Sequence, residues 1–61
     1  MKVATTGVAR RVVVVEDEPL TQSLVTSVLA TAGFVARGVD SADLAIAALR
    51  DFDPDVLVVD L

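Results

Sequence analysis

Acidic residues follow two separate apolar runs of this chain. Residues 16–18 are three consecutive acids directly after the valines of 12–15, and Asp60 comes directly after the apolar run 56–59. Carboxylates that are brought together in a partly dry cleft repel one another, raise each other's pKa and are costly unless a cation neutralises them. A hard divalent ion such as Mg²⁺ prefers oxygen ligands of this kind. If the two runs lie side by side, the sequence therefore predicts a metal site.

The acids at 16–18 also have a simpler explanation. Pro19 suits the first position of a helix, and acidic residues just before it would lie at the positive end of the helix dipole. That explanation leaves Asp60 unaccounted for. A nucleotide-binding loop is a poor fit, because it needs a glycine-rich turn after the first strand, and acids at 16–18 would repel phosphate.

The periodicity of the chain predicts the elements that carry these acids. The valines of 12–15 fit a strand buried on both faces, and therefore one in the middle of a sheet. A helix is expected from Pro19 to about Ala32, with Gly33 ending it. The helical spacing predicts a core-facing stripe made of Leu20, Leu24, Val25, Val28, Leu29 and Ala32.

The second half of the chain predicts an edge strand, a helix and a third strand. The edge strand covers 34–39. The helix starts at Asp40 or Ser41. It ends near Phe52, because Pro54 moves Asp53 out of helical conformation. The buried stripe of this helix is expected to be Leu44, Ala45, Ala48, Leu49 and Phe52. The third strand covers 56–61 and is expected to be an exposed edge, open to pairing with another chain.

The resulting order of strand, helix, strand, helix, strand predicts an α/β fold. With right-handed crossovers it is the opening of a doubly wound, flavodoxin-like parallel sheet with strand order 2-1-3, truncated after the third strand. Ligands of such sheets bind beyond the carboxyl ends of the strands, where the strand order reverses. Glu16, Asp17 and Asp60 are all expected there.

The composition narrows the class of protein. The 61 residues carry a net charge of -4 with dispersed basic residues, which argues against nucleic-acid binding. The chain has no cysteine or histidine, so a disulfide framework and a zinc site are both excluded. No apolar run is long enough for a signal peptide or a membrane helix, so a cytoplasmic protein with no membrane contact is expected. Residues 1–9 show no period and predict a flexible N-terminal arm.

From Arg11 to Leu61 the sequence resembles the receiver domain of bacterial two-component response regulators. The likeness lies in Val-Val-Glu-Asp-Glu-Pro after the first strand, Ser-Ala-Asp-Leu-Ala in the second helix, and Pro-Asp-Val-Leu-Val-Val-Asp-Leu into the third strand. Residues 10–61 would then be the first half of such a domain. The resemblance implies that Asp60 accepts a phosphoryl group from a histidine kinase in a phosphorelay. It also implies that Asp17 binds Mg²⁺ directly, that Glu16 binds it mainly through water, and that Glu18 only starts the helix.

The resemblance carries further expectations. The partners would be a histidine kinase and, in a homodimer, a second copy of the chain; the output domain is unidentified, and a DNA-binding output in transcription regulation is the commonest in the family. Receiver domains continue with two more strands and three more helices, which bring a hydroxyl residue, a lysine and a backbone ligand for the metal. The 61 residues alone are therefore expected to be inactive. Two alternatives remain: an interaction-only receiver-like module that is not phosphorylated, and a fragment of a metal-dependent phosphohydrolase.

Overall fold

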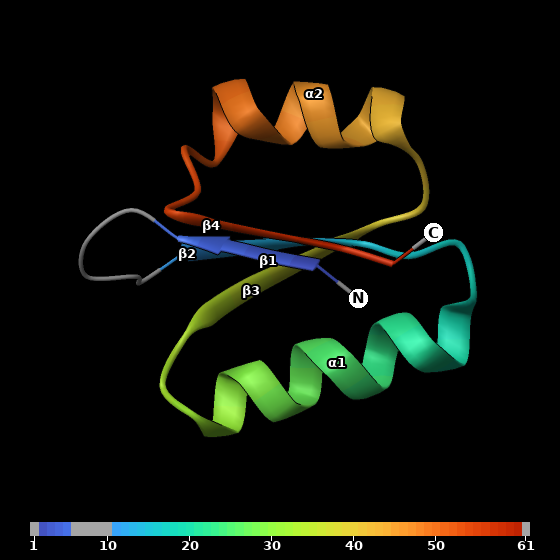
Figure 1. Ribbon diagram of the computed structural model, residues 1–61, viewed down its shortest axis with the longest axis vertical. Helices are drawn as coiled ribbons and strands as arrows, with labels where there is room; N and C mark the ends of the chain where they lie inside the picture. The colour runs from blue at the N-terminus through green and yellow to red at the C-terminus, as the bar shows by residue number, and fades with distance from the viewer. Residues whose placement is uncertain (1, 6–10, 61) are drawn as a thin grey trace.

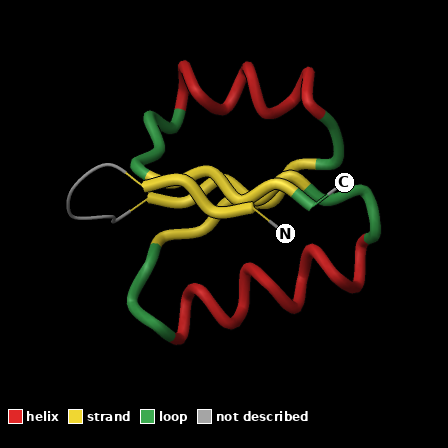
Figure 2. The backbone as a smooth tube through the Cα atoms, in the orientation of Figure 1, coloured by secondary structure: helices red, strands yellow, loops and turns green. Residues whose placement is uncertain are grey.

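The computed structural model describes residues 2–5 and 11–60, which form two helices and a four-stranded sheet. The sheet is a central layer with one helix on each face (Figures 1 and 2). In chain order the elements are β1 (Lys2–Thr5), β2 (Arg11–Val15), α1 (Pro19–Thr31), β3 (Val35–Val39), α2 (Ala42–Asp51) and β4 (Val56–Val59).

The strand order is β1-β4-β2-β3. Strand β2 pairs in parallel with both β3 and β4, so that Val12 is level with Ala36 on one side and with Val56 on the other. The α/β fold and the three-stranded parallel arrangement with the first valine strand at its centre are therefore confirmed. The two helices cover opposite faces, as right-handed crossovers on either side of a central strand require.

Strand β1 corrects two of the expectations. Lys2–Thr5 is not an arm but an edge strand, which pairs antiparallel with β4 from Lys2 beside Val59 to Thr5 beside Val56. Strand β4 is consequently covered on that side and is not an exposed edge. Four residues are too few to show a period, and their partner lies at the other end of the sequence, so local pattern could not reveal the pairing. The rest of the expected arm, residues 1 and 6–9, lies outside the described residues.

Both faces of β2 are buried, as its four valines predict. Val12 and Val14 face α1, and Val13 and Val15 face α2; the exposed fraction of Val12 and of Val13 is 0%. On the α1 side the core continues through Val56, Val58, Val25, Leu29 and Phe34. On the α2 side it continues through Ala45, Ala48, Val39, Phe52, Leu57 and Val59.

The ends of α1 follow the sequence signals. Glu18 is the N-cap, with a side-chain oxygen that accepts from the backbone N–H of Leu20 at 3.1 Å, and Pro19 begins the helix. At the other end Gly33 has φ +98°, and its N–H donates to the carbonyl of Ala30. The N–H of Phe34 donates to Leu29, which completes a Schellman motif.

The buried face of α1 differs from the expected one. Of the predicted stripe only Val25 and Leu29 pack against the core, whereas Leu20, Leu24 and Val28 are 81%, 65% and 60% exposed. Ala32, also predicted to be buried, is exposed. The helix is turned so that a polar residue, Gln22, faces the sheet instead, and the hydrogen bonds described below explain this orientation.

Helix α2 begins and ends where the sequence predicts. The Oγ of Ser41 accepts from the N–H of Leu44 at 3.3 Å and caps the helix, so Ser41 and not Asp40 takes this role. Phe52 is the C-cap, and Asp53 adopts a left-handed φ of 50° before Pro54.

The buried stripe of α2 is narrower than expected. Ala45 and Ala48 are buried and Phe52 packs against the same core, but Leu44 and Leu49 are 50% and 46% exposed. The helix therefore rests on its two small residues, and the larger leucines beside them stay at the surface.

Candidate functional site

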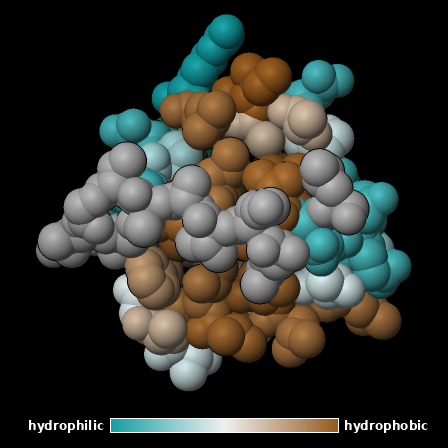
Figure 3. Space-filling view, in the orientation of Figure 1, coloured by the Kyte–Doolittle hydropathy of each residue, from teal (hydrophilic) through white to brown (hydrophobic). Residues whose placement is uncertain are grey.

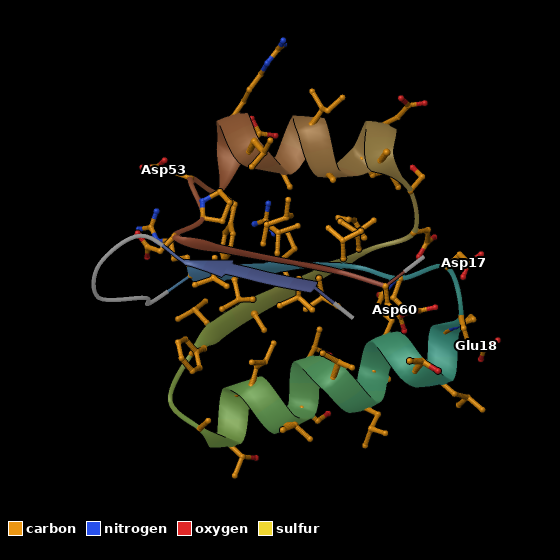
Figure 4. The ribbon with its side chains drawn as sticks, in the orientation of Figure 1. Asp17, Glu18, Asp53 and Asp60 are labelled. Carbon is orange, nitrogen blue, oxygen red and sulfur yellow. The ribbon has the colours of Figure 1, made fainter. Side chains whose placement is uncertain are left out.

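Four acidic residues lie at the edge of the sheet where the three parallel strands end. Glu16 and Asp17 follow β2, Asp40 follows β3 and Asp60 follows β4. Figure 4 shows Asp17 and Asp60 at this edge, with Asp53 at the opposite end of the sheet. The sequence correctly predicted that the acids after the two apolar runs share one edge.

Backbone hydrogen bonds extend the parallel pairing into this edge. The N–H of Glu16 donates to the carbonyl of Val39 at 3.0 Å, and the N–H of Asp60 donates to the carbonyl of Val15 at 3.0 Å. The starting points of the three loops are thus fixed relative to one another by the sheet itself.

Glu16 is a buried carboxylate, with an exposed fraction of 5%. Its Oε1 accepts from the backbone N–H of Glu18 at 2.9 Å, and its backbone carbonyl accepts from Nε2 of Gln22 at 2.9 Å. One of the two side-chain oxygens of Glu16 is thus engaged by the start of α1.

The pKa of Glu16 reports the charge around it. The hydrogen bond from the Glu18 backbone lowers this pKa, but the neighbouring Asp60, burial and the neighbouring Asp17 together raise it above the ordinary value of 4.5. The pKa of Glu16 is therefore affected by both of the other acids that the sequence places at the site, Asp17 and Asp60.

Asp17 and Asp60 also line a common cavity of about 470 Å³ between α2 and the sheet. Asp17 is exposed and Asp60 is half-buried. The cavity wall is mostly apolar, made by side chains such as Val15, Ala45, Leu57 and Val59, and Asp40 joins the two acids at its polar end. Figure 3 shows hydrophilic surface at this end of the molecule and apolar surface along the middle of the same view.

The acids do not form a complete metal cage. Within residues 2–5 and 11–60, no group of three or more acidic, histidine or cysteine side chains is placed so that it could hold a metal ion. The donor chemistry fits Mg²⁺, because carboxylate oxygens are its preferred protein ligands. The arrangement of Glu16, Asp17 and Asp60 falls short of a finished three-ligand site.

Comparison with known proteins identifies no relative. The chain matches no protein-family model, and no significant match was found among curated proteins or solved structures. Neither described helix is long and apolar enough to span a membrane.

Sequence reasoning missed two residues of this edge, Gln22 and Asp40. Asp40 was expected only as a helix cap, and Gln22 was not part of the core-facing stripe expected for α1. In the structure Nε2 of Gln22 donates to Oδ1 of Asp40 at 2.9 Å. The one available signal was Gly38, a glycine inside a short strand, which marks a place where another group approaches closely.

Proposed function

We propose that the chain is the first half of a response-regulator receiver domain, in which Asp60 accepts a phosphoryl group from a histidine kinase. The observation that carries the proposal is that Asp17 and Asp60, from two adjacent parallel strands, line one cavity where the strand order reverses. Ligand sites of doubly wound sheets lie at this reversal. A cytoplasmic location is part of the same proposal.

The chemistry assigned to Asp60 is a direct displacement. A carboxylate oxygen of Asp60 forms a bond to phosphorus while the bond between phosphorus and the donor, a histidine nitrogen of the kinase, breaks. The product is an acyl phosphate, and the histidine leaves with the electron pair. Asp60 is only half-buried, so an incoming phosphoryl group can reach it.

Magnesium is the proposed cofactor, held by Asp17 and Asp60 directly and by Glu16 mainly through water. When bound, it would offset the negative charge on the transferring phosphoryl oxygens. The donor chemistry supports this assignment, because carboxylate oxygens are the protein ligands that Mg²⁺ prefers. The engaged Oε1 of Glu16 supports its indirect role.

The test is phosphorylation of the intact protein that carries these residues. Incubation with acetyl phosphate and Mg²⁺ should add one phosphoryl group by mass, and Asp60→Asn should abolish the addition. Asp53→Asn is the matched control, since Asp53 lies at the far end of the sheet and asparagine tolerates its positive φ. Labelling that survives Asp60→Asn would contradict the proposal.

One observation favours the interaction-only alternative. The described residues contain no group of three acidic, histidine or cysteine side chains that is placed to hold a metal ion. A module that is never phosphorylated does not need such a group. An intact protein that accepts no phosphoryl group from acetyl phosphate or from a kinase, while still binding a partner, would decide for this alternative.

A further inference from the structure

The outward side of α1 carries a ridge of large apolar side chains. Leu20, Leu24 and Val28 recur at every fourth position, and all three are exposed. With about 3.6 residues per turn, they lie on the side of the helix opposite Leu29, which packs against the core. Helix α1 is the only described helix on its face of the sheet (Figure 1), so no other described helix covers this ridge. A contiguous apolar ridge at the surface is typical of an interaction site.

A row of small side chains runs beside this ridge. Ser23, Ser27 and Thr31 also recur at every fourth position and are exposed. The hydroxyl of Thr31 donates to the carbonyl of Ser27 at 3.0 Å, so Thr31 can be covered without leaving its donor unpaired. Small residues beside a ridge let a second helix approach closely and place its own ridge in the groove. The ridge and the row together form what we call the outer face of α1.

The outer face carries no charge. The chain has nine acidic and five basic residues and a net charge of -4, yet none of them lies between Pro19 and Ala36. Two molecules with the same net charge repel each other, and an uncharged surface is where that repulsion is weakest. Recognition of a different protein usually relies on complementary charges, and this face has none to offer. Its electrostatics therefore favour a second copy of the same chain.

We propose that the outer face of α1 is the interface of a symmetric dimer, in which α1 packs antiparallel against α1 of a second copy, centred on Leu24. A two-fold axis at Leu24 lets each ridge fill the gaps in the ridge of the other copy. The antiparallel orientation keeps the two Glu18 carboxylates at the N-caps apart. It also places the start of each helix beside the end of the other, as the helix dipoles favour. This inference does not depend on the proposed function.

The size of the outer face sets the strength of this dimer. Helix α1 has 13 residues, which makes it about 20 Å long and about 10 Å wide. One side of such a helix covers less than the roughly 800 Å² per partner of a standard interface. The dimer is therefore weak and reversible, and its population rises with protein concentration.

The first test is sedimentation equilibrium of the intact protein over a range of concentrations. The wild type should show a monomer–dimer equilibrium. Leu24→Ser removes the central contact from both copies and should weaken association at least about 10-fold, because burial of one leucine is worth that factor or more. Ile46→Ser is the matched control on α2, where Ile46 is 53% exposed, and should associate like the wild type. A wild type that stays monomeric, or equal weakening by both variants, would overturn the proposal.

The second test asks whether the contact is with a copy of the same residue. Leu24→Glu and Leu24→Lys should each be monomeric, because like charges would meet at the two-fold axis. An equal mixture of the two variants should form a mixed dimer, since opposite charges then face each other. Circular dichroism should show that each variant keeps its helices. Folded variants that remain monomeric after mixing would contradict contact between the two copies of Leu24.

The third test determines the orientation of the helices. The 61 residues contain no cysteine, so a single cysteine can be introduced at either of two matched positions of the outer face. In an antiparallel pair centred on Leu24, the two copies of Ser23 are offset by about 3 Å along the helix and the two copies of Thr31 by about 21 Å. A short thiol cross-linker should therefore join Ser23→Cys and not Thr31→Cys. Equal cross-linking at both positions would overturn the antiparallel arrangement.

Discussion

The backbone N–H of Asp60 donates to the carbonyl of Val15 at 3.0 Å, so the acid that follows β4 is held one residue beyond Val59, the ladder partner of Val15. Glu16 comes directly after Val15, and Asp60 is one of the groups that raise the pKa of Glu16. The central ladder of the sheet therefore does more than support the core. It sets the spacing between two acids that are 44 residues apart in the sequence.

Metal affinity should depend on Asp17 more than on Glu18. In the intact protein Asp17→Asn removes a charged oxygen at the cavity, and Mg²⁺ binding should fall sharply. Glu18→Gln changes only the cap of α1, where the lost charge is worth about 0.3–1 kcal/mol of stability and little affinity. Mg²⁺ titrations of both variants test this, and equal loss of affinity would show that the ligands are wrongly assigned.

The metal-free protein should lose stability as the pH rises through the pKa of Glu16. This pKa is raised in the folded state, so the protonated form of Glu16 is favoured by folding. Its contribution is complete below the unfolded value of about 4.5 and disappears above the folded value. Glu16→Gln keeps the acceptor for the Glu18 N–H and should flatten this dependence.

Urea unfolding at a series of pH values, without divalent ions, measures the effect. The wild type and Glu16→Gln should differ least at low pH and most near neutrality, where the variant should be the more stable. A wild type that gains stability relative to Glu16→Gln as the pH rises would contradict the direction of the shift.

The orientation of α1 can be tested with two leucines of the same helix. Leu29 packs against the core and Leu24 is 65% exposed. Leu29→Ala should lower the free energy of unfolding by about 2 kcal/mol or more, whereas Leu24→Ala should change it by no more than about 0.5 kcal/mol. The reverse order of the two variants would mean that α1 follows its apolar pattern after all.

The 61 residues by themselves should not be a stable monomer. Ordering a chain costs on the order of 1.5 kcal/mol per residue, and a chain of this length buries little surface in return. Since β1 already covers β4, association should run through the exposed stripe of Leu20, Leu24 and Val28. Sedimentation should show oligomers of the wild type and fewer of Leu24→Glu. A monomer with a sharp thermal transition would contradict this expectation.

Most of the fold follows from local signals in the sequence. The valines of β2 required a central strand, and Pro19, Gly33, Ser41 and Pro54 marked the ends of the helices correctly. The edge shared by Glu16, Asp17 and Asp60 followed from parallel topology alone. Their roles with metal and phosphate remain proposals.

The remainder depended on partners distant in the sequence. The strand Lys2–Thr5 exists through its pairing with β4, and the turn of α1 depends on what Gln22 contacts. Hydrophobic periodicity treats a glutamine as a surface residue, so it assigned Leu24 to the core and Gln22 to solvent. In the structure Gln22 instead lies against Gly38 and donates to Asp40.

The pairing of β1 with β4 has a kinetic consequence. Each backbone N–H and C=O along that side of β4 can belong to one ladder at a time, and the first residues of the chain already occupy it. If further strands follow, as the resemblance implies, the next one can join beside β4 only by strand exchange. The rate of completing the sheet would then be limited by the rate at which β1 dissociates from β4.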